Sequence, residues 1–203
     1  MPPFELPLFP LQLLPLPGEK HGLYIFEERY KLLFNRLEDM TLTEFGIPFI
    51  KGNQIAGIGA TMRLVVTNQT ADSGERNVVV QATDLIQILR FSEQPTSSDR
   101  TTPMYPLGQV TPWSGWREWK TGNRAQAEWM EQWVMSEPKD MAMKPPGELI
   151  PFLIQVNAPP TVRMQVIAQP NEAKRDKILG AWMKSQRLMR MQERQREGGI
   201  FPN

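Results

Sequence analysis

Short runs of apolar residues, separated by proline, glycine and turn-forming residues, fill the first half of the chain. Runs of this length favour strands, because an amphipathic helix needs apolar residues three and four positions apart over a longer stretch. Residues 67–77 separate two of the runs and contain Asp-Ser-Gly, which tolerates turn dihedrals, so a hairpin is predicted there. The predicted strands are Phe4–Phe9, Leu11–Leu16, Phe45–Ile50, Ile58–Val66, Val78–Ala82, Leu85–Phe91 and Met104–Val110.

One helix is predicted within this region, over residues 27–38. Four apolar residues follow one another at the spacing i, i+3, i+4 and i+7, so they share one face of a helix. Glu27 and Glu28 stand in its first turn, where the helix dipole favours negative charge. The four apolar residues are Tyr30, Leu33, Phe34 and Leu37.

From about residue 113 the pattern changes to Trp, Met, Gln, Glu and Lys at helical spacing. Helices begin at predictable places, after prolines or after a capping residue such as Asn171. We therefore predict an α+β fold with a β domain over residues 1–112 and a helical domain over residues 113–203. The predicted helices are Trp116–Met135, Glu148–Val156, Thr161–Ala168 and one from Asn171 to about Gln195.

The composition argues against most catalytic chemistry. The chain has no cysteine, which excludes disulfides, thiolate metal sites and cysteine nucleophiles, and His21 is its one histidine. No glycine-rich phosphate loop follows a predicted strand. Lys184 and Ser185 are neighbours on a predicted helix and do not face each other as a catalytic pair would. We predict a binding protein that is not an enzyme, with no catalytic residue, cofactor or metal.

The charge and hydropathy of the chain indicate where the protein is located and which kinds of partner it binds. Lys plus Arg number 23 and Asp plus Glu number 22, a formal charge of +1 that gives no global case for a nucleic-acid or membrane partner. No run approaches the roughly 18 apolar residues of a membrane helix. The apolar segment 1–18 lacks a basic leader and is interrupted by prolines, unlike a signal peptide. We expect a cytoplasmic protein without a membrane partner.

Several motifs of the chain resemble the Lon protease N-terminal domain. That family opens with an L-P-L-F-P-L strand, a P-G turn and an I-F-E-x-R-Y junction between strand and helix. One departure is Ala82–Ile86, where the family usually has a G-x-x-R-F segment. The matching segments are Leu6–Leu11, Leu16–Gly18, Leu23–Tyr30, Phe45–Ile47, Gly57–Gly59 and Asp72–Gly74, followed by Glu148–Ile154, Val162–Ala168 and Asn171–Arg175.

The resemblance implies a PUA-like β pseudo-barrel followed by a C-terminal helical bundle. It also implies a non-catalytic module that binds protein substrates. Lon proteases carry an ATPase and a serine–lysine peptidase downstream, and neither follows before Asn203, so we expect a freestanding, proteolysis-related adaptor or chaperone-like domain. The expected partners are unfolded or exposed apolar protein segments, with a separate protease or ATPase as an open further partner.

Tryptophans and methionines concentrate after residue 112 and are candidates for peptide contact. Packing of the helical core explains most of them, because a domain poor in leucine must fill its interior with other apolar residues. An exposed aromatic and thioether surface could instead adapt to varied apolar segments. We predict a contact surface at the junction between the early helix and the tryptophans. Its residues are Glu27, Glu28, Lys31, Trp113 and Trp116.

The last predicted helix supports an alternative, RNA binding by a PUA-like protein. Residues 174–196 carry eight basic and two acidic side chains, a local charge of +6. An apolar stripe from Ile178 to Met189 lies opposite many of these charges, which favours a solvated outer face of a helical domain. Only Trp182 offers an aromatic ring among the basic residues, whereas RNA readers usually combine both. Nucleic acid is therefore the less favoured partner.

Overall fold

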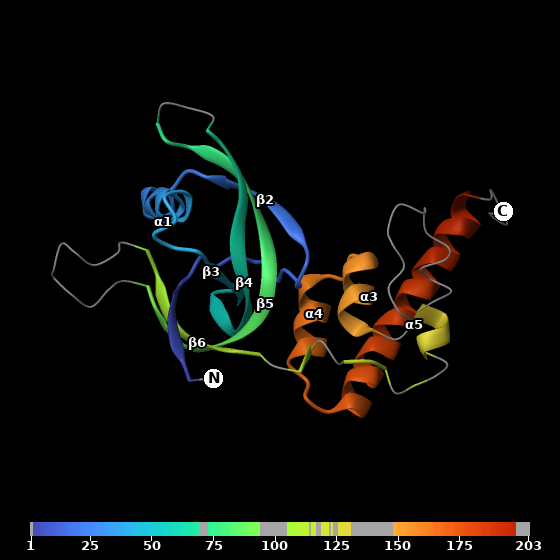
Figure 1. Ribbon diagram of the computed structural model, residues 1–203. Helices are drawn as coiled ribbons and strands as arrows, with labels where there is room; N and C mark the ends of the chain where they lie inside the picture. Colours follow the sequence, from blue (N-terminus) through green and yellow to red (C-terminus); the bar gives the residue numbers. More distant parts are fainter. Residues whose placement is uncertain are drawn as a thin grey trace. The chain divides into compact units, whose positions relative to one another are not determined.

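The chain divides into two compact units, Met1–Arg117 and Glu118–Asn203, which are described separately. Strands and one helix form the first unit, and helices form the second (Figure 1). The predicted α+β class is confirmed. Strand β6 ends at Pro112, and the domain boundary expected after residue 112 stays a prediction. The computed structural model describes residues 2–69, 73–93, 105–113, 115–116, 119–121, 123, 126–130 and 148–197.

Six strands in the described part of the first unit form one antiparallel sheet, in the order β1-β6-β5-β4-β3 with β2 paired to β5. The long strand β5 therefore pairs with β4 along one edge and with β2 and then β6 along the other. The strands are β1 (Phe4–Pro7), β2 (Lys20–Ile25), β3 (Phe45–Lys51), β4 (Gln54–Gln69), β5 (Arg76–Ser92) and β6 (Leu107–Pro112).

Three strand predictions need correction. Two predicted runs, 78–82 and 85–91, are one strand, because β5 accommodates Thr83 as an extra residue where the pairing with β4 shifts. The predicted strand Leu11–Leu16 is wrong: of its residues only Leu11 pairs, by an isolated bridge to Phe49. Strand β2 was missed, because Gly22 and polar residues interrupt its apolar pattern.

Helix α1 (Glu28–Glu38) confirms the helix predicted over residues 27–38. All four apolar residues of the predicted face are buried. The ring of Tyr30 lies 4.0 Å from that of Phe9, and Phe34 meets Phe45 of β3 edge to face at 5.4 Å. Aromatic packing of this kind adds to the area term of burial and fixes the helix on the sheet.

Leu8, which is buried, connects the two strands at opposite ends of the sheet order, β1 and β3. It follows β1 and forms an isolated parallel bridge with Gly46 of β3, and Leu11 forms another with Phe49. A Cβ atom at Gly46 or at Gly108 of β6 would collide with the Leu8 side chain. The two glycines are therefore required by close packing around Leu8 rather than by turn geometry.

Arg76, at the start of β5, ties α1 to the sheet. Its side chain is 2% exposed. The guanidinium donates to Glu38 Oε1 at 2.7 Å, to Asn35 Oδ1 at 2.6 Å and to the carbonyl of Gly74 at 3.1 Å. A buried cation is tolerated only when it is paired in this way, so the network fixes α1 against the β4–β5 hairpin.

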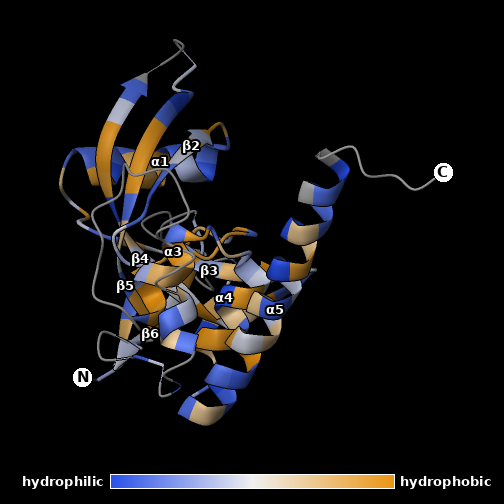
Figure 2. Cartoon of the chain, turned by 90° about the vertical axis from the view of Figure 1, so that its right-hand side faces the viewer, coloured by the Kyte–Doolittle hydropathy of each residue, from blue (hydrophilic) through white to orange (hydrophobic). Residues whose placement is uncertain are grey.

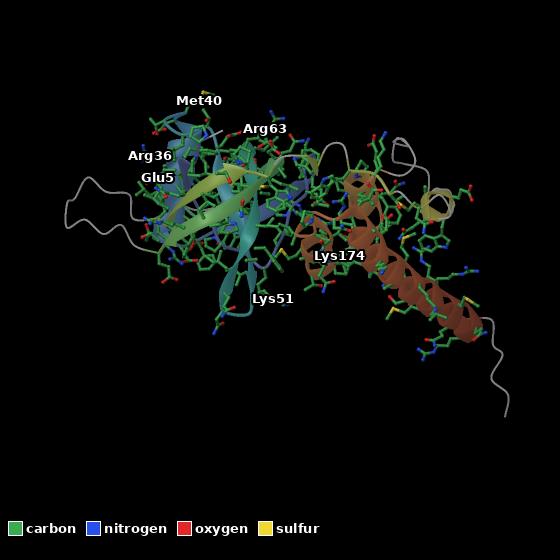
Figure 3. All side chains as sticks on the ribbon, turned by 90° about the horizontal axis from the view of Figure 1, so that it is seen from below. Glu5, Arg36, Met40, Lys51, Arg63 and Lys174 are labelled. Atoms are coloured by element: carbon green, nitrogen blue, oxygen red, sulfur yellow. The ribbon has the colours of Figure 1, made fainter. Side chains whose placement is uncertain are left out.

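The second unit contains helices α3 (Leu149–Gln155), α4 (Pro160–Ile167) and α5 (Glu172–Glu197), which confirm the last three helix predictions. Asn171 caps α5 as predicted, because its Oδ1 accepts the backbone N–H of Lys174 at 3.0 Å. Lys174 is labelled in Figure 3. Within the described ranges, none of the helices combines the length and apolar character that a membrane span requires.

The helix predicted over residues 116–135 is wrong at its start. Lys120 forms an isolated β-bridge with Glu148. Asn123 then accepts the backbone N–H of Gln126 at 3.2 Å and begins the helical residues 126–130. Residues 131–135 lie outside the described part of the chain. Trp113, Trp116 and Trp119 consequently do not form a stripe on one helix.

Two buried arginines satisfy backbone carbonyls beside the prolines of the second unit. Arg163 donates to the carbonyl of Ala158 at 2.6 Å. Arg175 donates to the carbonyls of Gln169 and Pro170 at 3.1 and 2.9 Å, and its guanidinium lies 4.6 Å from the ring centre of Trp119. These contacts hold the connections before α4 and α5, where proline removes backbone donors.

Replacing Arg76 tests the buried network. Arg76→Met removes the cation and leaves Glu38 and Asn35 without their partner, which is expected to lower the free energy of unfolding by about 3 kcal/mol. Arg63→Met, at an exposed arginine of the same unit, is expected to change it by no more than about 0.5 kcal/mol. Denaturant titrations followed by circular dichroism measure both, and equal losses would contradict the assignment.

Candidate functional site

The first turn of α1 is engaged in contacts that fix the hairpin. Lys31 is 8% exposed, pairs with Glu28 Oε1 at 2.8 Å and donates to the carbonyl of Ser73 at 2.9 Å. Glu27 pairs with Arg29 at 2.9 Å. The carboxylate of Glu28 nevertheless faces solvent, with 84% of its side chain exposed. Lys31 therefore stabilises the fold, and Glu28 is the residue of this turn whose side chain a partner could contact.

The two predicted tryptophans are half-buried and attach farther along β5. Trp113 donates its backbone N–H to the carbonyl of Leu85 at 2.8 Å, and Trp116 donates Nε1–H to Asp84 Oδ1 at 2.6 Å. Asp84 lies eight residues after Arg76, which contacts α1, and eight extended residues span about 26 Å. The structure does not bring the two halves of the predicted surface together, and their binding role stays a prediction.

An exposed apolar surface lies where the first part of β5 is flanked by β2 and β4. Side chains of alternate residues share one side of a strand, so the pairing registers place three rows across these three strands. We call this outward side the arm face. Its rows are Lys20–Gln81–Arg63, Gly22–Val79–Val66 and Tyr24–Asn77–Asn68.

The arm face carries apolar side chains although the opposite side of the same strands faces the core. Tyr24 and Val66 are 51% and 45% exposed. A bulge in β4 adds Val65, which is also exposed. Phe26, directly after β2, stacks on Tyr24 with the ring centres 6.1 Å apart. Figure 2 shows hydrophobic segments along this part of both long strands. Contiguous exposed apolar surface typically marks an interaction site.

Gly22 lies in the middle row, at the β2 side of the arm face, and we call the position that lacks a side chain there the notch. It pairs with Val79 and lies between Lys20 and Tyr24 on β2. A Cβ atom added at Gly22 would have no heavy atom within 4 Å. Gly22 is therefore required neither by a close backbone approach nor by a positive φ, and its lack of a side chain leaves the side of Val79 open.

The two ends of the arm face differ in charge. At one end, Arg63 donates to Gln81 Oε1 at 2.7 Å, and exposed Lys20 lies across β5 from it. Neither cation forms an ion pair with any residue that the structure describes. Arg63 is labelled in Figure 3. At the other end, the Tyr24 hydroxyl donates to Glu75 at 2.5 Å, and this bond to the carboxylate raises the pKa of Tyr24 above its usual value of 10.0.

Sequence reasoning missed the arm face. The alternation from Lys20 to Ile25 is a signal for a half-buried strand, and it sets Tyr24 on the same side as Gly22. The neighbours of these residues come from β4 and β5, however, and no local pattern gives the register between strands. Residues far apart in sequence thus compose the surface.

A concave feature lies within the described residues of the second unit. A groove of about 790 Å³ runs between helical residues 126–130 and α5. Gly180 allows the close approach here, because a Cβ atom there would lie 3.1 Å from the Gln126 amide nitrogen. Three cations of α5 line the groove with two acidic residues. The lining includes Trp129, Glu172, Asp176, Lys177, Lys184 and Arg187.

Known proteins are similar to this chain in fold. A Lon N-terminal domain protein from Xanthomonas campestris superposes with a TM-score of 0.63 and 19% identity, covering 88% of this chain and 98% of its own. The N-terminal domain of a Mycobacterium avium complex Lon protease gives 0.57 and 12%, covering 89% and 98%. No protein-family model and no curated protein matches the chain. The resemblance to Lon N-terminal domains is thus confirmed at the level of fold.

The described residues contain no cluster of three or more His, Asp or Glu side chains that could hold a metal ion. The rows of the arm face consist of apolar side chains, amides and isolated charges. Such groups bind by surface complementarity.

The phenol of Tyr24 provides a test of the charged end of the arm face. Glu75→Gln removes the negative charge that stabilises the neutral phenol, so the pKa of Tyr24 is expected to fall toward 10.0. Burial raises the pKa of Tyr30 to about 12 and also raises that of Tyr105, so these rings serve as internal references. A titration followed by the ring resonances of each tyrosine measures all three, and an unchanged pKa of Tyr24 would contradict the assignment.

Proposed function

We propose that this protein binds exposed apolar segments of other proteins and is not an enzyme. The observation that carries the proposal is the arm face, an apolar surface on a sheet whose three strands are hydrogen-bonded to one another. Similarity in fold to Lon N-terminal domains supports a substrate-recognition role of the adaptor or chaperone-like kind.

The arm face suits this role energetically. Exposed apolar side chains release water when a partner covers them, at about 25 cal/mol for each Å². Ladder hydrogen bonds hold Tyr24, Val66 and Val79 in place, so little conformational entropy is lost on binding. Valine and aromatic side chains also accept varied apolar partners, because dispersion contacts make few geometric demands.

The five contact residues predicted from sequence contribute less to the proposed binding than the arm face does. Glu27 and Glu28 follow Phe26 directly, so the first turn of α1 extends the aromatic end of the arm face. There the carboxylate of Glu28 would limit nonspecific association. Lys31 supports the hairpin, and Trp113 and Trp116 would form a separate contact.

Other features of the protein also belong to the proposal. The bridges at Leu8 and Leu11, which link β3 to the chain after β1, support a PUA-like pseudo-barrel. The packing of α4 against α5 supports a C-terminal helical bundle. We further propose domains over residues 1–112 and 113–203, a cytoplasmic location and a separate protease or ATPase as partner.

RNA binding through α5 is a second candidate. Lys184 and Arg187 are exposed, and so are Leu188, Met189 and Met191, although Met189 was expected to lie on the buried stripe. The end of α5 therefore presents cations to solvent without a packed apolar face beneath them. This arrangement suits a polyanion as well as a protein.

Truncating an arm-face side chain tests the proposed function. Val66→Ser is expected to weaken binding of a labelled, permanently unfolded polypeptide about fivefold, because it removes roughly 1 kcal/mol of apolar burial. Leu89→Ser, the same kind of change at a 46% exposed residue elsewhere on β5, is the matched control and should leave the affinity unchanged. Fluorescence anisotropy measures both.

Salt dependence separates the two candidates. Apolar binding should vary little with salt, whereas phosphate contacts release counterions and weaken steeply as salt rises. Recovery of RNA instead of polypeptide, with Val66→Ser and Leu89→Ser both silent, would contradict the proposal and favour α5.

A further inference from the structure

The chemistry of the arm face is specific enough to restrict which segments it accepts. Three features lie on neighbouring rows: the cations Lys20 and Arg63, the notch at Gly22, and the Tyr24 ring. Neighbouring rows are two residues apart along β2 and β5, which is about 7 Å, and the bulge at Val65 makes the first step on β4 three residues long. An extended segment that follows the strands spaces its alternate side chains by the same distance.

We propose that the arm face selects extended segments in which an apolar residue and an acidic residue are two positions apart. The apolar side chain occupies the notch over Gly22, against Val79. The carboxylate lies between Lys20 and Arg63. This inference rests on the proposed function and names the class of segment that the same surface recognises.

The notch provides the apolar half of this selectivity. Gly22 offers no side chain, and the residues around it on the face are Val79 and Tyr24. A leucine or phenylalanine placed there would contact the valine methyl groups and the edge of the tyrosine ring. Any side chain on residue 22 would occupy the same volume.

Charge complementarity provides the other half. Lys20 and Arg63 flank Gln81, whose Oε1 accepts both Nε–H and Nη2–H of Arg63 at 3.2 and 2.7 Å. This bidentate contact holds the guanidinium at the edge of the face, where it can also meet a carboxylate. At the opposite end Glu75 repels an acidic residue, so the face favours a carboxylate at one end only.

A side chain introduced at Gly22 tests whether the notch selects an apolar residue. Gly22→Val should fold normally, because the added Cβ atom meets no neighbour within 4 Å and valine suits a strand. It is expected to weaken binding of a peptide with an apolar core about tenfold, which corresponds to the loss of one buried side chain. Gly57→Val is the matched control: Gly57 is an exposed β4 residue whose added Cβ also meets nothing within 4 Å.

Peptides that carry an aspartate test whether the arm face selects an acidic residue. Three synthetic peptides share one apolar core and carry either an aspartate two positions before the central leucine, an aspartate two positions after it, or serine at both places. At least one aspartate peptide should bind about three- to fivefold more tightly than the serine peptide, as exposed ion pairs allow. Lys20→Gln combined with Arg63→Gln should abolish this advantage, so that the aspartate and serine peptides bind the double variant with equal affinity.

The outcomes separate the inference from the proposed function. If the peptides bind but Gly22→Val behaves like Gly57→Val, or neither aspartate peptide exceeds the serine peptide, the selectivity is wrong and the proposed function survives. The selectivity is also wrong if the aspartate advantage persists in the double variant. If no peptide and no unfolded polypeptide binds, both are wrong.

Discussion

Strand β5 is the constraint on which the first unit depends. It is hydrogen-bonded along both edges, to β4 on one side and to β2 and then β6 on the other. Over residues 76–82 its alternate residues divide between two sides, with Val78 and Val80 buried and Asn77 on the outer face. A slip of one residue would exchange the core with the surface, so the register of β5 determines the core and the arm face together.

Charged groups that are satisfied within the fold keep this arrangement in place. Arg76 and Lys31 both connect α1 to residues 73–76, at the turn end of the β4–β5 hairpin. Because α1 is fixed on the inner side of the strands, it does not cover the outer side, where the apolar residues of the arm face lie (Figure 1). Polar interactions inside the unit thus make an apolar surface available outside it.

Much of the fold could be predicted from sequence because its signals are local. The spacing of the apolar residues in α1 and the cap at Asn171 each depend on residues within a few positions of one another. The strand predicted over residues 11–16 failed because an apolar run with prolines suits extended structure without pairing. The helix predicted from Trp116 was placed too early in the chain, because Lys120 forms a β-bridge with Glu148. No local pattern predicts a contact between residues so far apart in sequence.

The candidate site was harder to predict for the same reason. The prediction of Glu28 and Trp116 rests on residue type and on their place at the junction between the early helix and the tryptophans, whereas the arm face depends on the pairing of β2, β4 and β5. Tyr24, Val66 and Gly22 carry no functional signal individually in the sequence. They form one surface only because β2, β4 and β5 pair in the observed register.

A titration of the isotope-labelled protein with an apolar peptide, followed by amide chemical shifts, tests the central claim most directly. Binding at the arm face predicts that the largest shifts cluster in residues 20–26, 63–68 and 75–81, on three strands that are distant in sequence. Shifts confined to α5, or to the region of Trp113 and Trp116, with the three strands unaffected, would contradict it.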